Sequence, residues 1–284
     1  MKKILITGSS GFVGKHLSRK LDQLNIKPFE LDIAKGYDLT SLEFKNEEKF
    51  DLIIHLASRS YVPHSFQEPK NFYYTNFFST LNILELARAK NSDVIFFSSY
   101  LYGTPLYLPI DEEHPLFPHN PYAQSKLICE KLCEGYYRDF GVKTIILRPF
   151  NLYGSGQNMN FLIPAMISQM HSGFMTLDDP RPRRDYLFID DLISLLIKMI
   201  DKEFNGLQVY NIGSGVSYSV YEVATKLSSL FRKDIKISFR DVYRKNEVLE
   251  TVANIDKVKR DFNWYPRVEI NEGLMKVLNT EPEA

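Results

Sequence analysis

The sequence has few cysteines and no excess of charge of either sign. Two of its 284 residues are cysteine, which is too few for a disulfide framework or a structural zinc site. Thirty-five lysines and arginines balance thirty-five aspartates and glutamates, so the chain lacks the long-range field that non-specific binding to nucleic acid or an anionic membrane needs. An anionic ligand must therefore be met by a local cluster of basic residues.

Long apolar segments are also missing. The longest falls well short of the roughly 20 residues that a membrane span requires, and Met1-Lys2-Lys3 leads into a short strand-like segment without a cleavage signal. We therefore expect a cytoplasmic protein with no membrane partner. Cys129 and Cys133 lie four residues apart in a helical segment, and we interpret them as small apolar residues on one helix face.

What the sequence does have, from Lys3 to Pro149, is an alternation of short β-rich segments with helical ones. This pattern is typical of a parallel sheet with helices on both faces, which binds ligands beyond the carboxyl ends of its strands. The expected strands are Ile4–Thr7, Pro28–Asp32, Asp51–Leu56, Val94–Ser98 and Thr144–Leu147. The expected helices are Phe12–Leu24, Ser41–Glu48, Phe72–Ala89 and Pro121–Phe140.

After Pro149 the alternation weakens, and glycine and proline become frequent. Further helices are expected near Leu162–His171, Asp191–Asp201 and Val220–Phe231. We therefore expect an α/β protein with two domains. A doubly wound parallel sheet occupies residues 1–150, and a smaller α/β substrate lobe occupies residues 151–284, with some segments crossing between them.

One connection in the first domain is too short for a helix. Asp32 and the next expected strand-end residue, Asp38, are separated by five residues that include Gly36. A crossover connection needs about a dozen residues or more, so no crossover helix fits here. If Asp38 ends a strand of its own, the strand that His55-Leu56-Ala57 closes is the fourth in the chain.

The loop Gly8-Ser9-Ser10-Gly11-Phe12-Val13-Gly14 follows the first strand and opens a helix, which is the context of a Rossmann-type dinucleotide-binding loop. Gly8 permits the tight turn, Gly11 lets the backbone approach a pyrophosphate, and Gly14 lets the helix pack closely on the strand. The helix N-terminus offers unpaired N–H groups to the anion. The alternative is a tight turn without a ligand.

Asp32 ends the second strand, at the offset of roughly 20 residues where a carboxylate accepts hydrogen bonds from an adenosine ribose. Its charge repels a 2′-phosphate, so we expect NAD as the cofactor rather than NADP. A solvated turn aspartate is the alternative. Lys35 in the following loop could still receive a phosphate, which leaves NADP open.

Tyr122-Ala123-Gln124-Ser125-Lys126 contains a candidate proton-transfer pair. Asn120-Pro121, just before it, is typical of a helix start, and a spacing of four puts the phenol and the ammonium on one helix face. A phenol with a pKa near 10 is a poor acid–base group at neutral pH, and an adjacent cation lowers that pKa. By itself the spacing also fits ordinary packing of a surface helix.

Together with further segments in the same order, the chain resembles the extended short-chain dehydrogenase/reductases, the NAD-dependent epimerase/dehydratase family that acts on nucleoside-diphosphate sugars. The resemblance runs from about Lys3 to Leu274. The further segments are His55-Leu56-Ala57, Asn76-Phe77-Phe78-Ser79-Thr80 with Ser79 in place of a glycine, Phe97-Ser98-Ser99-Tyr100-Leu101-Tyr102-Gly103, the substrate-phosphate turn Arg148–Gln157, and the second-lobe segments Arg183–Asp191 and Tyr210–Gly215.

The resemblance implies roles for the catalytic residues. Tyr122 is the general acid/base, Lys126 holds the cofactor ribose and lowers the pKa of the phenol, and Ser98 is hydrogen-bonded to the reacting sugar oxygen. Asn76 braces the site, and a plain helix-face asparagine is its alternative. The expected cofactor-binding residues are Gly8, Gly11, Phe12, Val13, Gly14, Asp32, Asp38, Leu39, Leu56, Ala57, Asn76, Lys126 and Pro149.

A chain without net charge needs placed cations to hold the diphosphate of a nucleotide sugar. By the resemblance, Arg184 and Arg244 grip it, and surface salt bridges are the alternative for both. The alignment around Arg244 is loose, because Glu247 and Asn254 stand where the family usually has aspartate. The expected substrate-binding residues are Ser99, Tyr100, Asn151, Arg184 and Arg244.

Departures from the family narrow the reaction. The 4,6-dehydratases carry Asp-Glu directly after the catalytic hydroxyl, and this chain has Ser99-Tyr100, so dehydration is excluded and decarboxylation is disfavoured. Reduction of a nucleoside-diphosphate 4-keto-6-deoxyhexose and 4-epimerisation, as in UDP-glucose 4-epimerase, remain. The short connection after Asp32 and the turn Gly154–Gln157 favour reduction, whereas the NAD preference of Asp32 favours epimerisation.

Two other expectations come from the same resemblance. A cofactor-sensing protein on this fold typically lacks the tyrosine–lysine pair, which is intact here, so we expect an enzyme. Family members often dimerise through two helices of each chain, here Phe72–Ala89 and Pro121–Phe140, so we expect a homodimer. The nucleotide base, the sugar and the product stereochemistry stay open.

Overall fold

A computed structural model describes residues 2–41, 48–231, 234–244 and 247–280, and it divides into two compact units that are described separately. The first unit comprises residues 1–103, 115–149 and 193–211, and the second comprises residues 104–114, 150–192 and 212–284. Two segments, 104–114 and 193–211, thus cross the expected boundary at residue 150.

The first unit is built on a six-stranded sheet with the order β2-β1-β3-β4-β5-β9. Its strands are β1 Ile4–Thr7, β2 Phe29–Leu31, β3 Leu52–His55, β4 Asp93–Phe97, β5 Thr144–Pro149 and β9 Leu207–Ile212. Neighbouring strands from β2 to β5 are parallel. The five strands expected in this region are confirmed, with ends that differ by one or two residues.

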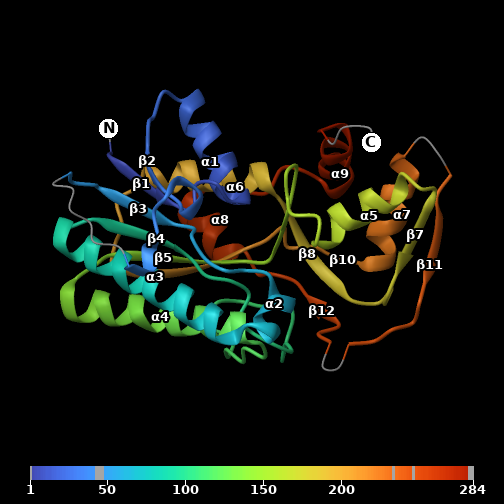
Figure 1. Ribbon diagram of the computed structural model, residues 1–284, viewed down its shortest axis with the longest axis horizontal. Coiled ribbons are helices and arrows are strands. Elements are labelled where there is room, and N and C mark those ends of the chain that lie inside the picture. The colour runs from blue at the N-terminus through green and yellow to red at the C-terminus, as the bar shows by residue number, and fades with distance from the viewer. Residues whose placement is uncertain (1, 42–47, 232–233, 245–246, 281–284) are drawn as a thin grey trace. The chain divides into compact units, whose positions relative to one another are not determined.

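Helices cover both sides of this sheet. They are α1 Phe12–Gln23, α2 Val62–Gln67, α3 Pro69–Lys90, α4 Pro121–Phe140 and the part of α6 Ile189–Ile200 from residue 193 onward. Figure 1 shows α3 and α4 side by side along one side of the sheet and α1 on the other. The start of α4 is fixed locally, because the Asn120 side chain accepts a hydrogen bond from the Ala123 N–H at 2.8 Å.

The core between α3, α4 and the sheet contains both cysteines. Cys129 and Cys133 are free thiols and fully buried, and they pack in one cluster with Ile83, Phe96 and Ile146. The interpretation of the two cysteines as small apolar residues on one helix face is therefore confirmed.

The connection from β2 to β3 corrects one expectation and confirms another. It contains the 3-10 turns η1 Ile33–Lys35 and η2 Leu39–Ser41, so no crossover helix lies between Asp32 and Asp38. The placement of Asp38 at a strand end is wrong, because its carboxylate accepts a hydrogen bond from the Thr40 N–H at 2.9 Å, as turn aspartates do. The strand that ends at His55 is therefore the third. Residues 42–47 of the expected helix Ser41–Glu48 lie outside the described residues.

A buried ion pair ties α4 to β5. Arg148 donates from Nε and Nη2 to the two carboxylate oxygens of Glu130, at 3.1 and 2.7 Å, and the side chains are 6 and 1 % exposed. Arg148 Nη1 also donates to the Tyr102 hydroxyl at 3.0 Å, and that hydroxyl donates to Asn211 on β9 at 2.5 Å. Buried charges are tolerated when they are paired and hydrogen-bonded, so this network fixes α4 against the sheet.

The second unit contains small sheets and short helices. Its strands are β6 Asn151–Tyr153, β7 Phe174–Leu177, β8 Arg183–Phe188, β10 Ser217–Ser219, β11 Lys236–Phe239 and β12 Glu250–Thr251. Its helices are α5 Leu162–Met170, α7 Val220–Leu230, α8 Asp256–Phe262 and α9 Ile270–Thr280. The central strand β8 pairs with β6, β10 and β12, and β7 pairs with β11. The three helices expected in this part of the sequence are confirmed as α5, α6 and α7.

Asp185 on β8 organises the second unit. Its fully buried carboxylate accepts hydrogen bonds from the backbone N–H groups of Ser214, Gly215 and Ala253, at 2.6, 2.9 and 3.1 Å. Burial raises the pKa of Asp185, and these hydrogen bonds oppose the increase. A side chain on Gly213 would lie 2.6 Å from the same carboxylate, so only glycine fits at this position of the loop.

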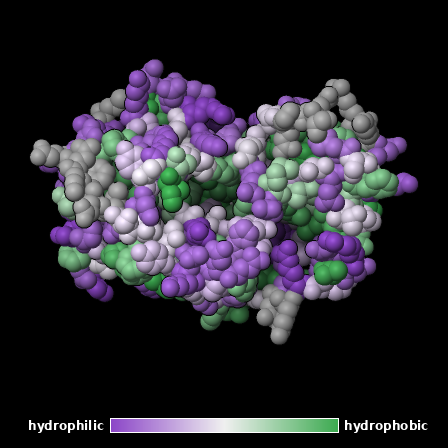
Figure 2. Space-filling model, in the orientation of Figure 1, coloured by the Kyte–Doolittle hydropathy of each residue, from purple (hydrophilic) through white to green (hydrophobic). Residues whose placement is uncertain are grey.

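The surface carries no extended apolar region on the face that Figure 2 presents, where hydrophobic residues form small groups among hydrophilic ones. Within the described ranges, none of the helices has the length and apolar character needed to span a bilayer. Nor do these ranges contain a group of three or more His, Cys, Asp or Glu side chains that could hold a metal ion.

Candidate active site

The glycine loop has the close packing expected of a phosphate-binding turn. Gly8 has a φ of 72°, and a side chain there would meet the Ala57 backbone nitrogen at 2.7 Å. A side chain on Gly14 would lie 2.2 Å from the Gly8 carbonyl oxygen, so α1 packs directly on the turn. Helix α1 begins after Gly11 without a side-chain cap and without an acidic residue in its first turn, which keeps its N-terminus suited to an anion.

Asp32 follows β2 and is held by two backbone groups. One carboxylate oxygen accepts a hydrogen bond from the Ser10 N–H of the glycine loop at 2.9 Å, and the other accepts one from the Ala34 N–H at 2.8 Å. Each oxygen keeps a second lone pair, which a ribose hydroxyl can use. Lys35, the residue that could receive a phosphate, forms an ion pair with Glu30 on β2.

Ser98 is the first residue after β4. Its N–H donates to the Leu147 carbonyl at 2.8 Å, but its buried hydroxyl has no hydrogen-bond partner among the described residues, and the same is true of the Ser9 hydroxyl in the glycine loop. A buried hydroxyl without a hydrogen-bond partner destabilises the folded protein by roughly 1–3 kcal/mol. Such a group fits a site where a ligand oxygen completes the hydrogen bond.

Tyr122 and Lys126 lie one turn apart near the start of α4. Tyr122 is partly buried, and its ring meets that of Phe72 edge to face, with the centroids 6.4 Å apart. Lys126 is buried; its ammonium donates to the Phe97 carbonyl at 2.6 Å and lies 4.8 Å from the centre of the Phe96 ring. Burial lowers the pKa of Lys126 to about 8, despite opposing influences from Cys129, Cys133 and Glu130.

The expectation that Lys126 lowers the pKa of Tyr122 is wrong for this structure. Burial raises the pKa of Tyr122 above its usual value, and a hydrogen bond from Ser99 only partly opposes the increase. The ammonium of Lys126 is directed to the Phe97 carbonyl instead. The sequence spacing brings the two residues to one helix face, but burial determines the pKa of the Tyr122 phenol.

Asn76 on α3 joins three segments of the first unit. Its amide nitrogen donates to the Ser125 hydroxyl on α4 at 2.8 Å and to the Arg59 carbonyl at 3.1 Å. Its amide oxygen accepts a hydrogen bond from the Arg59 N–H at 2.8 Å. A fully bonded, buried amide of this kind supports a bracing role between α3, α4 and the loop after β3.

The other expected cofactor and substrate residues of the first unit occupy strand ends and turns. Phe12 and Val13 form the first turn of α1, and Pro149 ends β5. The Leu56 N–H donates to the Thr7 carbonyl at 3.1 Å, and the Ala57 N–H donates to the Thr7 hydroxyl at 3.3 Å. Leu39 is buried in η2. Ser99 and Tyr100 follow Ser98 and are partly exposed, and the Tyr100 hydroxyl donates to the Gly103 carbonyl.

The expected diphosphate residues belong to the second unit, where one carboxylate faces both arginines. Arg184 on β8 donates to the Val248 carbonyl at 2.7 Å and forms an ion pair with Glu247. Arg244 is 78 % exposed and lies 4.0 Å from the other oxygen of Glu247. Asn151 on β6 donates weakly to the Asp185 carbonyl, at 3.5 Å.

Sequence reasoning did not identify the carboxylates that pair with the basic residues of the site. Glu30 pairs with Lys35, and Glu247 pairs with Arg184. Glu30 stands on β2 two residues before Asp32, whose backbone is still extended just after the strand, so the two side chains share a face. The alternation of side chains along an extended segment could have identified Glu30. Glu247 stands three residues after Arg244, but its contact with Arg184 joins positions 63 apart in the chain and leaves no local signal.

Comparison with known proteins identifies the family. The NAD dependent epimerase/dehydratase family matches residues 4–213. The chain belongs to this family. GDP-6-deoxy-D-mannose reductase of Pseudomonas aeruginosa is 30% identical over 98% of this chain and 96% of its own length. A putative UDP-glucose 4-epimerase of Methanocaldococcus jannaschii is 29% identical over 97% of each chain.

The fold is confirmed by solved structures as well. The structure of RMD from Pseudomonas aeruginosa complexed with NADPH has a TM-score of 0.89, with 30% identity and 98% of each chain covered. The expected Rossmann-type α/β fold, the resemblance to nucleotide-sugar enzymes and the expectation of an NAD-dependent enzyme are therefore confirmed.

The low pKa of Lys126 predicts that replacing this residue with methionine stabilises the protein at neutral pH. The pKa is about 8 in the folded protein and about 10.4 in an unfolded chain, so the unfolded chain binds more protons between these values. The unfolding free energy of the unaltered protein therefore rises between pH 8 and pH 10, because Lys126 is then neutral in the folded protein and still charged in the unfolded chain. Lys126→Met should be more stable by roughly 3 kcal/mol at pH 7, and the difference should shrink to about 1 kcal/mol or less by pH 10.

Urea unfolding at pH 7, 8, 9 and 10 measures this difference. Lys131→Met is the matched control, because that lysine lies on the same helix with a 62 % exposed side chain, and its effect should stay within about 0.5 kcal/mol at every pH. A benefit of Lys126→Met that does not change with pH would contradict the assignment.

Proposed function

We propose that the chain reduces a nucleoside-diphosphate 4-keto-6-deoxyhexose at C4, with NADH as the cofactor. The observation that carries the proposal is the buried Ser98 hydroxyl, which has no hydrogen-bond partner within the described ranges, because a carbonyl or hydroxyl oxygen of a sugar completes its hydrogen bonding. Tyr122 and Lys126 stand in the same unit, on the helix that follows in the chain.

Each residue has a defined task in this reduction. NADH, when bound, supplies the hydride that reaches C4. Ser98 donates a hydrogen bond to the C4 oxygen, and Tyr122 transfers its phenolic proton to that oxygen as the ketone becomes an alcohol. Lys126, which is cationic below about pH 8, holds the cofactor ribose.

Two observations support reduction over the alternative, 4-epimerisation. No crossover helix lies between Asp32 and Asp38, and the chain is similar over almost its full length to GDP-6-deoxy-D-mannose reductase. The similarity to a UDP-glucose 4-epimerase and the NAD preference of Asp32 keep epimerisation as the second candidate.

We also propose that NAD binds in preference to NADP. The glycine loop fits a dinucleotide, since side chains on Gly8 and Gly14 would collide with the turn, and Asp32 is fixed where a ribose hydroxyl is expected. We propose the other cofactor-binding residues as the sequence predicts them. Among these, Asn76 braces the site through its hydrogen bonds to Ser125 and Arg59. The P. aeruginosa structure carries NADPH, so the preference has to be measured for this chain.

Arg184 and Arg244 are our proposed diphosphate ligands, with Asn151, Ser99 and Tyr100 as further substrate contacts. Both arginines form ion pairs with Glu247, so a diphosphate that binds them has to replace this carboxylate. Arginine suits a diphosphate because its planar donors bind two oxygens at once.

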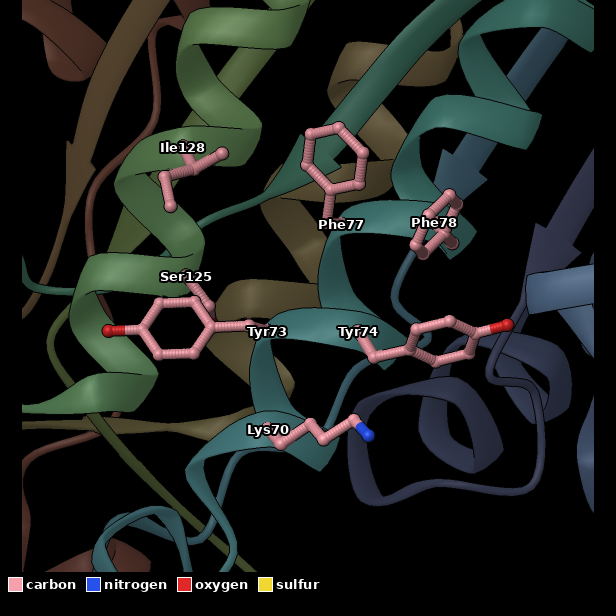
Figure 3. Close-up of a pocket in the computed structure, with 7 residues that line it drawn as sticks. All are labelled: Lys70, Tyr73, Tyr74, Phe77, Phe78, Ser125 and Ile128. Atoms are coloured by element: carbon pink, nitrogen blue, oxygen red, sulfur yellow. The ribbon is translucent and has the colours of Figure 1, made fainter.

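A homodimer is proposed from the outer surface of α3 and α4. Figure 3 shows a groove there, lined by Lys70, Tyr73, Tyr74, Phe77 and Phe78 on α3 and by Ser125 and Ile128 on α4. Tyr74 is 50% exposed, Phe78 37% and Ile128 42%. Large apolar side chains gathered on one surface are typical of protein contacts, and a second copy of the helix pair would bury them.

The cytoplasm is the proposed location. Cys129 and Cys133 are both free thiols, which is the usual state of cysteine in a reducing compartment. Expression with a fluorescent tag and fractionation would test the location.

Cofactor consumption separates the two candidate reactions. Given a nucleoside-diphosphate 4-keto-6-deoxyhexose and NADH, the protein should form one 6-deoxyhexose nucleotide for each NADH oxidised, measured by absorbance and chromatography. Tyr122→Phe is the matched control: it should lower the rate by about a hundredfold or more and leave NADH affinity unchanged, because it removes only the transferable proton. If absorbance stays constant with every 4-keto substrate, while UDP-glucose is converted to its C4 epimer without added cofactor, epimerisation replaces this proposal.

Arg184→Met should weaken nucleotide binding while leaving NADH affinity unchanged, because the residue binds the diphosphate of the substrate only. Calorimetric titration with GDP and with UDP should show a loss of about tenfold or more for the nucleotide that binds. Arg240→Met removes a comparable charge from an exposed pair with Asp178 in the same unit, and it should change neither affinity. A loss of NADH affinity in Arg184→Met would contradict the assignment.

Sedimentation equilibrium should give twice the chain mass of 33.0 kDa. Ile128→Glu should shift the protein towards the monomer, because it places a charge on the proposed contact surface. Tyr221→Glu is the control, since Tyr221 is 55% exposed on α7 in the other unit, and it should leave the dimer intact. A monomeric unaltered protein at micromolar concentration would rule out the dimer.

A further inference from the structure

Two carboxylates, one on β2 and one directly after it, lie next to the glycine loop. Glu30 and Asp32 are two residues apart on an extended segment, so their side chains share one face. Glu30 accepts a hydrogen bond from the Ser18 hydroxyl on α1 at 2.5 Å. Asp32 accepts one from the Ser10 N–H, just before α1. Both carboxylates are therefore directed towards α1 and the phosphate-binding turn.

Lys35, three residues after Asp32, is paired with one of these carboxylates. Lys35 is the sole lysine or arginine among residues 28–41, and its N–H donates to the Asp32 carbonyl at 2.9 Å. Its ammonium forms an ion pair and a hydrogen bond with Glu30. Burial raises the pKa of Glu30, but the contacts with Lys35 and Ser18 outweigh burial and hold the pKa below its usual value.

The ion pair adds little to stability but occupies the lysine. The side chains of Lys35 and Glu30 are 44 and 22 % exposed, and pairs with this exposure contribute little net free energy in water. While the pair exists, however, Lys35 has a neutralising partner on the strand. A second anion near Asp32 would meet two carboxylates and a lysine that is already bound.

We propose that Glu30 is a specificity-determining residue, which holds Lys35 away from the 2′-phosphate of NADP and so favours NAD. This inference rests on the proposed function, because it places the adenosine ribose of the cofactor at Asp32. Asp32 excludes the phosphate by direct repulsion, and Glu30 excludes it by withholding the cation that could neutralise it. Loss of the Glu30 charge frees Lys35, whose flexible chain can then reach the added phosphate.

Glu30→Gln tests the inference, because glutamine keeps the size of the side chain and an acceptor for Ser18. In calorimetric titrations with NADH and NADPH, the Kd for NADPH should fall by about fivefold and that for NADH should change by less than about twofold. The gain should disappear in the double variant Glu30→Gln/Lys35→Met. It should also shrink at about 0.5 M salt, because an exposed lysine–phosphate contact is screened.

Glu134→Gln controls for the change of net charge, since Glu134 pairs with Lys131 on the exposed side of α4, and it should leave both affinities unchanged. An unchanged NADPH affinity in Glu30→Gln, with NADH still bound, would overturn this inference and leave the proposed function standing. A gain that persists without Lys35 would overturn it too. If the unaltered protein bound neither cofactor, the proposed function would fail and the inference with it.

Discussion

The buried ion pair between Glu130 and Arg148 positions the groups from which the chemistry is built. Glu130 lies one turn after Lys126 on α4, and Arg148 follows Leu147, whose carbonyl accepts the Ser98 N–H. The pair therefore connects the helix that carries the lysine to the strand neighbouring the serine. If either partner were removed, a buried charge would be left without compensation, which costs several kcal/mol. The helix and the sheet are accordingly held in one arrangement.

Burial then determines which protons the site can move. The same loss of water that lowers the pKa of Lys126 raises that of Tyr122, because in both cases it disfavours the charged form. The result is a neutral phenol beside a lysine that still carries its charge at pH 7. Ser98 adds a buried hydroxyl that no group in the described part of the chain satisfies. A neutral proton donor together with an unsatisfied hydrogen-bonding group is what the proposed reduction requires, because the oxygen of a ketone gains negative charge as it is reduced.

Local signals allowed most of the first unit to be predicted, and non-local contacts account for what was missed. Asn120-Pro121 marks the start of α4 within a few residues, and the bounds of that helix were predicted correctly. Asp38 was misplaced because a turn aspartate and a strand-end aspartate look alike in sequence. The pKa of Tyr122 was predicted in the wrong direction because the spacing to a lysine is visible in the sequence, whereas burial is not. The pairing of Arg148 with a residue 18 positions away has no sequence signature.

The two candidate reactions share every catalytic residue, so the difference between them must lie in how the cofactor is held. A reductase releases its oxidised cofactor in every turnover, whereas an epimerase retains it. Residence time depends on the number of contacts broken on release. In the described part of the connection after β2, residues 32–41 contain two 3-10 turns, and the ion pair between Lys35 and Glu30 is partly exposed to solvent. If the proposed placement of the adenosine ribose at Asp32 holds, the loop that contains Asp32 and Lys35 bears on both the choice of cofactor and its exchange.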